Sequence, residues 1–385
     1  MSSNISIAGH RFDVIVIGVG SMGSSACYFL AKRGYHVLGI EQFDIPHERG
    51  SHAGQSRIIR KAYFEDPGYV PLLNRAYDNW KNLEDVTGTQ LYFRTGIVYA
   101  GEPTNEMIKG VKRSADLYGI SLEDIDKKRF PQFELPENFE ILFEPEAGFI
   151  TPEKAVTLYA QQAIKNGATI QKEESVVEWR KKESEILVIT NKNTYRCKKL
   201  VITAGAWAGK MIPGMDIEIK VTRQFVAWLK TTAKNFDLNS FPCWMIADDK
   251  RPGAYYGFPV LPESFGQPTG LKLAHHYPGN IADPDNVNRK TTTEDTENLE
   301  YVLQKYLPTA VGSLEQSKIC LYANSPDENF IIDRLPGYED QVVIACGFSG
   351  HGFKFVSVVG ELLADLVEER KTAQSIEFLS ATRFV

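Results

Sequence analysis

The sequence predicts an α/β protein in which an antiparallel-sheet domain is inserted into the fold that an opening strand–helix–strand unit begins. Three observations predict this class. The apolar run 12–17 is followed by small and apolar residues at helical spacing, 21–32, and by a second apolar run, 36–40. The middle third alternates apolar and polar residues, as half-exposed antiparallel strands do. From residue 342 the α/β pattern returns, so the first fold is expected to be discontinuous in sequence.

The opening unit is predicted element by element. Strand 12–17 leads into helix 21–32, which Gly34 closes as a C-cap glycine would, and strand 36–40 follows. Such a unit implies parallel strands with a right-handed crossover. The polar stretch 44–56 is predicted to be a long loop, a feature that is usually functional or disordered. The other predicted elements are helices 69–87, 155–167 and 356–369, and strands 169–171, 186–190, 199–203, 216–230, 255–259, 271–274 and 342–347.

The composition indicates a folded chain of two to three domains. The 385 residues are 43% hydrophobic and 24% charged, unlike disordered chains. The net charge of -6 argues against general nucleic-acid binding. Five cysteines without a C-x-x-C pair suit a reducing compartment and no metal site.

Targeting signals are not evident in the sequence. Residues 1–11 lack the basic and apolar regions of a signal peptide, and the apolar stretch 14–31 is broken by glycines and serines. The last three residues, 383–385, are not a peroxisomal signal. We expect a cytoplasmic protein that binds neither membrane nor nucleic acid.

A glycine fingerprint joins the first strand to the first helix. Gly18 permits the tight turn, Gly20 lets a pyrophosphate approach the backbone, and Gly23 lets helix and strand pack closely. Glu41, at the end of the second strand, is placed to bind a ribose hydroxyl and disfavours a 2′-phosphate. A lone fingerprint is a common accident, but here strand, helix, second strand and acid all occur together. The pattern predicts a Rossmann-like domain that binds FAD or NAD.

Two further glycine turns favour FAD over NAD. The stretches 204–207 and 347–352 each follow a predicted strand, and several such turns can cradle a long flavin cofactor. Taken singly, each is more often an ordinary turn.

Three cations of the sequence are candidates for anion binding. Arg57 and Arg60 lie in the polar stretch 51–60, and arginine forks bind carboxylates bidentately. Lys354 lies between two phenylalanines, which suggests a partly buried ammonium with an anionic partner. The alternatives are a solvated loop with structural arginines and a surface lysine.

With these motifs in order from the first strand to the last helix, the sequence resembles the family of monomeric sarcosine oxidase and N-methyl-L-tryptophan oxidase. The last motif is long and specific. The motifs that carry the resemblance are Ser51-His52-x-Gly54-x-x-Arg57-Ile58-Ile59-Arg60, Tyr255-Tyr256-Gly257-Phe258-Pro259, Gly270-Leu271-Lys272, Ser325-Pro326-Asp327-Glu328-x-Phe330-Ile331-Ile332-Asp333 and Gly347-Phe348-Ser349-Gly350-His351-Gly352-Phe353-Lys354-Phe355.

The resemblance implies a monomeric two-domain flavoprotein that oxidises a secondary amino acid. It would use O2 and water to convert an N-methyl amino acid into the demethylated amino acid, formaldehyde and hydrogen peroxide. The expected division is an FAD-binding domain of residues 1–85, 145–215 and 321–385, with a substrate domain of residues 86–144 and 216–320.

The resemblance also implies covalent FAD, attached through the sulfur of Cys320 to the flavin 8α-methyl. From the residues alone, Cys320 would be taken as a buried free thiol. The candidate cofactor contacts, from the fingerprint, the glycine turns and the resemblance, are Gly18, Gly20, Ser21, Met22, Gly23, Glu41, Gln42, Ser51, Arg57, Val177, Gly205, Trp207, Cys320, Gly347, Gly350, Gly352, Phe353 and Lys354.

For the substrate, the resemblance implies that Arg60 and Lys354 hold the carboxylate and that Lys272, beside the flavin N5, serves the reaction with oxygen. Glu65 matches an acid near the substrate. The further polar residues matched to the active site are Tyr256, His276 and His351.

The sequence departs from the family pattern at several places. The family loop commonly reads Ser-His-His-Gly-Asp, whereas Ala53 and Gln55 stand here, and Lys61 replaces a histidine. Segment 259–270 is a longer, Pro-rich linker, and His275 beside His276 leaves open which histidine acts.

These departures leave the substrate open. A cyclic imino acid such as proline or pipecolate, or glycine, is an alternative. Two other classes are a flavoprotein dehydrogenase that passes electrons to a partner protein and an NAD-binding module without redox function.

Overall fold

The computed structural model describes residues 11–212, 217–231, 235–248, 250–276, 279–310, 312–368 and 372–384. The chain forms two compact units. The first takes its residues from Met1–Ala53, Pro152–Val221 and Tyr322–Val385, and the second from Gly54–Thr151 and Thr222–Leu321. Each unit has its own sheet and its own core.

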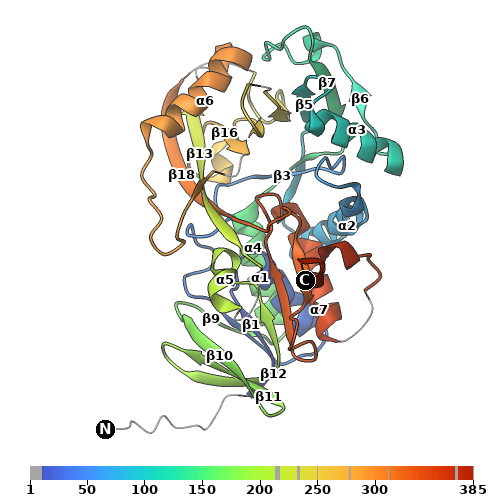
Figure 1. Ribbon diagram of the computed structural model, residues 1–385. Helices are drawn as coiled ribbons and strands as arrows, with labels where there is room; N and C mark the ends of the chain where they lie inside the picture. Colours follow the sequence, from blue (N-terminus) through green and yellow to red (C-terminus); the bar gives the residue numbers. More distant parts are fainter. Residues whose placement is uncertain are drawn as a thin grey trace. The chain divides into compact units, whose positions relative to one another are not determined.

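The first unit is built on the predicted strand–helix–strand opening. β1 (Arg11–Ile17) pairs in parallel with β2 (Val37–Ile40) on one side and β12 (Thr194–Ile202) on the other. The crossover helix α1 (Ser21–Lys32) packs against α4 (Pro152–Lys165) and α7 (Val356–Val367), as Figure 1 shows. The predicted α/β class and the β-α-β unit are therefore confirmed.

The sheet of this unit runs in the order β10-β11-β12-β1-β2-β9, with β20 beside β12 and β19 beside β20. The β10–β11 hairpin and β19 pair antiparallel, whereas β20 and β9 pair in parallel. The remaining elements of this unit are β9 (Thr169–Gln171), β10 (Val176–Lys182), β11 (Glu185–Thr190), β19 (Ile331–Arg334), β20 (Val342–Cys346) and α5 (Ala208–Met211).

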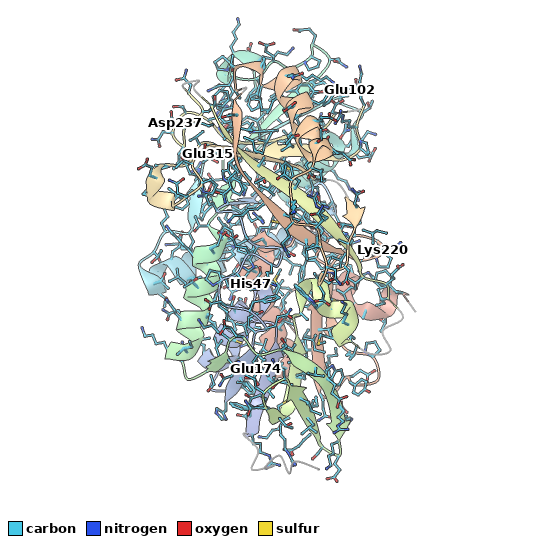
Figure 2. All side chains as sticks on the ribbon, turned by 90° about the vertical axis from the view of Figure 1, so that its left-hand side faces the viewer. His47, Glu102, Glu174, Lys220, Asp237 and Glu315 are labelled. Atoms are coloured by element: carbon cyan, nitrogen blue, oxygen red, sulfur yellow. The ribbon has the colours of Figure 1, made fainter. Side chains whose placement is uncertain are left out.

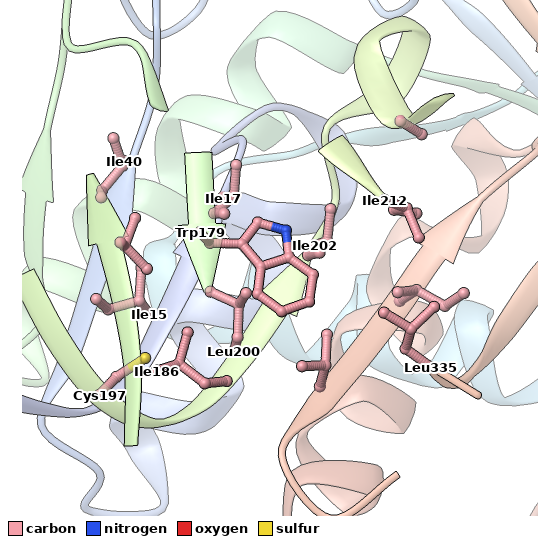
Figure 3. Packing of buried hydrophobic residues seen from close by; sticks show 14 of the residues in the cluster. Ile15, Ile17, Ile40, Trp179, Ile186, Cys197, Leu200, Ile202, Ile212 and Leu335 are labelled. Atoms are coloured by element: carbon pink, nitrogen blue, oxygen red, sulfur yellow. The ribbon is translucent and has the colours of Figure 1, made fainter. Parts of the chain in front are cut away.

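One face of this sheet carries a continuous apolar core, shown in Figure 3. Ile15 and Leu200 come from neighbouring strands, and Trp179 covers them from the hairpin. The Trp179 indole N–H donates to the Met211 carbonyl at 2.7 Å, which satisfies its polar atom inside the core.

The second unit is built on an antiparallel-rich sheet in the order β17-β13-β16-β15-β14-β5-β7-β6, with β18 beside β13. The strand expected over 216–230 is β13 (Lys220–Lys230). Most of its central residues are buried rather than half-exposed, because apolar clusters cover both faces of the strand. Residue 216 lies outside the described residues. The other strands are β5 (Ile97–Gly101), β6 (Glu123–Asp124), β7 (Glu140–Glu144), β14 (Cys243–Ile246), β15 (Ala254–Gly257), β16 (Leu271–His276), β17 (Asn280–Ile281) and β18 (Ser313–Asn324).

Where the structure describes this unit, it also contains a small sheet and three α-helices. β8 pairs antiparallel with both β3 and β4. The bounds are β3 (Arg57–Ile59), β4 (Tyr92–Arg94), β8 (Gly148–Ile150), α2 (Val70–Thr87), α3 (Glu106–Tyr118) and α6 (Thr293–Tyr306). The short 3-10 helices among the described residues of both units are Pro67–Tyr69, Lys127–Arg129, Gly205–Trp207, Glu263–Phe265, Pro308–Ala310, Phe353–Phe355, Glu377–Leu379 and Ala381–Phe384.

The large sheet of the second unit has two chemically different faces. Directly opposed residues on neighbouring strands share a face, so Trp228 lies beside Lys272, and Tyr256 beside Ala274. The opposite face carries Leu273 and Tyr255, which pack in one cluster with apolar residues of α6. Alternation along β16 therefore separates residues 272, 274 and 276 from the face that α6 covers.

The compact units do not follow the expected domain division at every boundary. Residues 54–85 and 145–151, expected with the FAD-binding domain, belong by their contacts to the second unit, because β3 pairs with β8. The assignment of a cofactor role and a substrate role to two domains stays a prediction. Within the described ranges, no helix is both long enough and apolar enough to cross a bilayer.

Candidate functional site

The glycine fingerprint lies where β1 ends and α1 begins. Gly18 has φ of +87°, and a Cβ there would lie 2.7 Å from the Thr203 carbonyl oxygen. A Cβ on Gly23 would collide with the carbonyl oxygen of Gly18. A Cβ on Gly20 would meet no atom within 4 Å. Two glycines therefore serve packing, and the third leaves open space before the α1 N-terminus.

This N-terminus fits the phosphates of a dinucleotide. Gly20 is the N-cap of α1 and provides no side-chain cap for the first-turn N–H groups. Those groups and the helix dipole attract an anion. Ser21 and Met22, the candidates beside it, are the first two residues of the helix.

Glu41 is a buried carboxylate fixed directly after β2. Its Oε2 accepts from the Val19 N–H at 2.9 Å and its Oε1 from the Phe43 N–H at 3.1 Å. Burial raises the pKa of Glu41 to about 7. The His47 ring, labelled in Figure 2, approaches Oε1 to 3.6 Å through its Nε2. These contacts hold an acceptor beside the fingerprint, as a ribose-binding acid requires.

The long glycine motif forms a loop tied to the chain before it. Gly347 and Gly350 both have positive φ, and the Ser349 N–H donates to the Ala323 carbonyl at 3.0 Å. The His351 Nε2 lies 3.1 Å from the Glu328 carbonyl oxygen. In this structure His351 therefore contacts the backbone of the neighbouring turn.

Lys354 is the middle residue of the 3-10 helix that leads into α7, and it is 5% exposed. Its Nζ donates to the His351 carbonyl at 2.7 Å and lies 5.6 Å from the Phe355 ring centroid. The surface-lysine alternative does not describe this side chain.

The remaining candidates of the first unit are scattered. Gly205 has φ of +54° and open space at its Cα, and the Trp207 ring lies 5.6 Å from the Phe43 ring. Val177 is 62% exposed on the edge strand β10, and no described contact joins it to the glycine loops. Gln42, Ser51 and Gly352 lie outside helices and strands, and Phe353 is the first residue of the 3-10 helix Phe353–Phe355.

In the second unit, Lys272 is a buried ammonium in a defined cage, at 2% exposure. Its Nζ donates to the Gly54 and Ser56 carbonyls, both at 2.6 Å, and to the Ser56 hydroxyl at 3.0 Å. The Phe258 ring centroid lies 4.3 Å away and that of Trp228 5.6 Å away. Oxygen acceptors and aromatic faces thus hold the cation at a fixed place.

Cys320 lies on the same sheet face as Lys272. It packs in one cluster with Val226, Trp228 and Ala274, and Tyr256 contacts this cluster. The Arg57 guanidinium donates to the Cys320 sulfur at 3.6 Å. A positive charge therefore stands beside this thiol.

The two adjacent histidines are on opposite faces of β16. His275 stacks on Tyr255 with centroids 4.2 Å apart, and its Nε2 lies 2.9 Å from the Pro252 carbonyl oxygen. Its Nδ1 lies 3.1 Å from the Asn298 amide nitrogen, and burial lowers the pKa of His275. His276 lies on the face of Lys272, since it is four residues further along the strand.

Arg60 is buried, at 2% exposure, rather than solvated. Its Nη2 donates to both carboxylate oxygens of Glu65 at 2.7 Å, and its Nη1 to the Ala62 carbonyl at 3.1 Å. The rings of Tyr63 and Phe64 lie 4.4 and 4.3 Å from the guanidinium carbon. Burial opposes the charge, but the Glu65 carboxylate outweighs it and raises the pKa of Arg60.

Sequence reasoning missed the residues that support these cations. Glu144 is fully buried and accepts from the Lys61 N–H at 2.6 Å, the Ala62 N–H at 3.2 Å and the Tyr99 hydroxyl at 2.7 Å. Burial raises the pKa of Glu144. Trp228 was also missed. The alternation along its strand indicates that residues 226 and 228 share one face of the sheet, and this signal could have pointed to it.

Comparison with known proteins identifies the family of the chain. The family model described as FAD dependent oxidoreductase matches residues 13–366. A monomeric sarcosine oxidase from Bacillus sp. (strain NS-129) is 39% identical over 383 residues, which is 97% of each chain. An N-methyl-L-tryptophan oxidase from Yersinia pestis (strain Pestoides F) is 33% identical over 97% of this chain and 99% of the relative.

Solved structures share the fold. NikD, an amino acid oxidase of nikkomycin biosynthesis, superposes with a TM-score of 0.85 at 23% identity and covers 96% of this chain and 97% of its own. The L-proline dehydrogenase from P. horikoshii gives 0.80 at 24% identity, with 98% of each chain covered. The chain belongs to the FAD-dependent oxidoreductases, in the family of monomeric sarcosine oxidase and N-methyl-L-tryptophan oxidase.

Proposed function

We propose that this protein oxidatively demethylates an N-methyl amino acid, with O2 and water as co-substrates. The products are the demethylated amino acid, formaldehyde and hydrogen peroxide. The observation that carries the proposal is the sheet face that presents Lys272 and Cys320 together, in a chain 39% identical to a monomeric sarcosine oxidase. When bound, FAD supplies the two-electron acceptor for the amine.

The first unit supplies the backbone groups for the cofactor. The space before Gly20 and the N–H groups of α1 would receive the pyrophosphate, and Glu41 would accept from the ribose. In the second unit, Cys320 would carry the covalent link. The Arg57 guanidinium, 3.6 Å from its sulfur, would stabilise negative charge on that atom.

Two buried cations would bind the substrate carboxylate, Arg60 and Lys354. Arg60 is already ordered by Glu65 and two aromatic rings, so little rotamer entropy is lost when an anion approaches. Lys354 is held by the His351 carbonyl in a similar way. Binding the carboxylate fixes the position of the N-methyl group, and positioning of this kind supplies much of the rate.

Lys272 would serve the reaction with oxygen. Its ammonium is ordered before the reaction, so it can stabilise the negative charge that develops on O2 without reorganising. His276 and Tyr256 would face the substrate from the same sheet face. His275 would not, because its ring contacts belong to the opposite face.

The test of the activity is a screen of peroxide release. Purified enzyme is mixed with sarcosine, N-methyl-L-tryptophan, proline, pipecolate and glycine. We expect the N-methyl amino acids to give the highest kcat/KM. A preference for proline, pipecolate or glycine would contradict the assigned substrate class, and reduction of the flavin without peroxide would indicate a dehydrogenase.

The test of the covalent link is acid precipitation. The yellow colour should stay in the pellet, and Cys320→Ala should release it into the supernatant. Cys197→Ala is the matched control, since Cys197 is another buried cysteine. Colour in the supernatant of the unmutated protein would contradict the link.

The proposal also takes the enzyme to be a cytoplasmic monomer. The five cysteines are buried and form no disulfide, which suits a reducing compartment. Size-exclusion chromatography with light scattering would measure the oligomeric state, and fractionation of the source cells would measure the location.

A further inference from the structure

Both the oxygen and the nitrogen of the Gln55 side-chain amide form hydrogen bonds. Its Oε1 accepts the indole N–H of Trp228 at 2.9 Å. Its Nε2 donates to the Gly266 carbonyl at 3.0 Å and to the Pro268 carbonyl at 2.9 Å. Gln55 itself adopts φ of +64°, a left-handed conformation that non-glycine residues rarely take. An unfavourable backbone held by three side-chain hydrogen bonds indicates that the position of this residue matters.

The residues on either side of Gln55 hold the Lys272 ammonium. Gly54 and Ser56 both accept from the Lys272 Nζ at 2.6 Å through their carbonyls. A shift of the backbone at residue 55 would therefore move both acceptors together. The hydrogen bonds from the Gln55 side chain to segment 259–270 hold this stretch of backbone in place.

Trp228 provides a second link between Gln55 and Lys272, in addition to the Gly54 and Ser56 carbonyls. The indole N–H is bound by Gln55, and the face of the same ring lies 5.6 Å from the Lys272 Nζ. A hydrogen bond that fixes the N–H fixes the tilt of the ring. It also polarises the indole towards greater electron density, which strengthens the attraction of the ring for a cation.

Only an amide meets these demands. A carboxylate at residue 55 could accept from Trp228, but it has no hydrogen to donate and would face the Gly266 and Pro268 carbonyls with repulsion. The Gln55 amide instead donates to both carbonyls and so bonds directly to segment 259–270.

We propose that Gln55 is a positioning residue that holds the cage of Lys272 in place and thereby sets the rate of reaction with O2. This inference rests on the proposed role of Lys272. It does not depend on which amino acid is the substrate.

The experiment separates the two half-reactions. The holoenzyme and its Gln55→Leu variant are reduced by light with a deazaflavin and EDTA, which requires no amino acid, and are then mixed with O2. We expect Gln55→Leu to slow reoxidation roughly tenfold, equivalent to about 1.4 kcal/mol. The rate of anaerobic reduction by sarcosine should change by less than about twofold. This is far less than the roughly tenfold change, about 1.4 kcal/mol, expected for reoxidation.

A second readout does not depend on turnover. The indole N–H resonance of Trp228, identified by its loss in Trp228→Phe, should shift upfield in Gln55→Leu as the hydrogen bond is lost. Gln132→Leu is the control, because Gln132 donates to the Asn235 carbonyl at 2.6 Å in the same unit. This control should leave both the resonance and the reoxidation rate unchanged.

The outcomes are distinguishable. A folded Gln55→Leu protein with a shifted resonance and unchanged reoxidation would overturn the inference. Equal loss of both half-reactions would also overturn it, because the role would then be structural. If Gln55→Leu does not fold, Gln55→Glu is tested in its place. This variant keeps the acceptor for the Trp228 N–H and loses the hydrogen bonds to the Gly266 and Pro268 carbonyls. Slower reoxidation would support the inference, and an unchanged rate would overturn it. A wild-type enzyme that no N-methyl amino acid reduces would contradict the proposed function alone, since photoreduction remains available.

Discussion

The candidate cofactor site of the first unit and the cation sites at Lys272 and Arg60 of the second hold charge in different ways. In the first, the candidate cofactor site consists largely of backbone: a helix N-terminus, open space at Gly20, and one carboxylate, Glu41, fixed by main-chain N–H groups. In the second, the charges are side-chain cations. Lys272 lies among carbonyl oxygens and rings, and Arg60 lies against Glu65.

This difference determines which substitutions each site tolerates. A backbone site is damaged mainly by changes that occupy space or alter φ, whereas a side-chain cation is lost with a single residue. Substitutions in the first site should therefore reduce cofactor binding, whereas substitutions in the second should slow individual steps of the reaction. The predictions below test this contrast.

The largest effect should come from Lys272→Met. Because a preordered cation is removed from the place where charge develops on O2, reoxidation of the reduced enzyme should slow by about 100-fold or more. Anaerobic reduction by substrate should change much less. Stopped-flow absorbance measures both, and Lys230→Met, at an exposed lysine of β13, is the control. Equal loss of both steps would show that Lys272 supports the fold instead.

The glycines should separate packing from cofactor binding. Gly23→Ala should destabilise the protein, since its Cβ collides with the Gly18 carbonyl, whereas Gly20→Ala should fold normally and still lose FAD. Flavin absorbance per chain and thermal denaturation measure the two effects. Gly209→Ala, whose Cβ would also meet nothing within 4 Å, is the control. A Gly20→Ala protein with full flavin content would refute the phosphate site.

Arg60→Met should weaken a carboxylate inhibitor such as methylthioacetate by roughly tenfold to a hundredfold, since hydrogen bonds to charged groups contribute about 1.5–3 kcal/mol. Arg60→Lys should restore only part of the affinity, because lysine lacks the guanidinium fork. Flavin difference titration measures the dissociation constant.

Removing Arg60 alone would take this partner from the partly buried Glu65 carboxylate, so Arg60→Met combined with Glu65→Gln is the matched variant. Lys354→Met should weaken the inhibitor as well. Unchanged inhibitor binding in both single variants, Arg60→Met and Lys354→Met, would show that these cations have a structural role only.

The smallest effect should be a pH dependence of FAD affinity. Burial holds the pKa of Glu41 at about 7 in the free protein, and ribose donors favour its ionised form. FAD binding should therefore release a proton and tighten as pH rises through about 7, by roughly threefold to tenfold, since one pKa unit is tenfold. Titration of flavin-free Cys320→Ala protein measures this, and Glu41→Gln should abolish the trend.

The sequence predicted local features well, because their determinants are adjacent. The α1 bounds and the fingerprint lie within one stretch of chain and match the structure. The capping box of α6, Thr292 with Asp295, is equally local but was not recognised. The resemblance supplied the candidate side chains of the second unit, yet not their supports.

Those supports depend on long-range pairing that no local pattern encodes. Lys272 meets Ser56, 216 residues away in the chain, and Gln55 meets Gly266, 211 residues away. Gln55 is a departure from the family loop in the sequence, and its role is visible only once strands β13 and β16 are paired.

Oxidation of the N-methyl carbon is tested by the product balance with sarcosine. The enzyme is incubated with sarcosine labelled with ¹³C in the methyl group, and formaldehyde, glycine and hydrogen peroxide are quantified together. We expect all three in equal amounts, with the label in formaldehyde. Glyoxylate and methylamine in place of formaldehyde and glycine would show that the other carbon–nitrogen bond is oxidised, and the enzyme would then not be a demethylase.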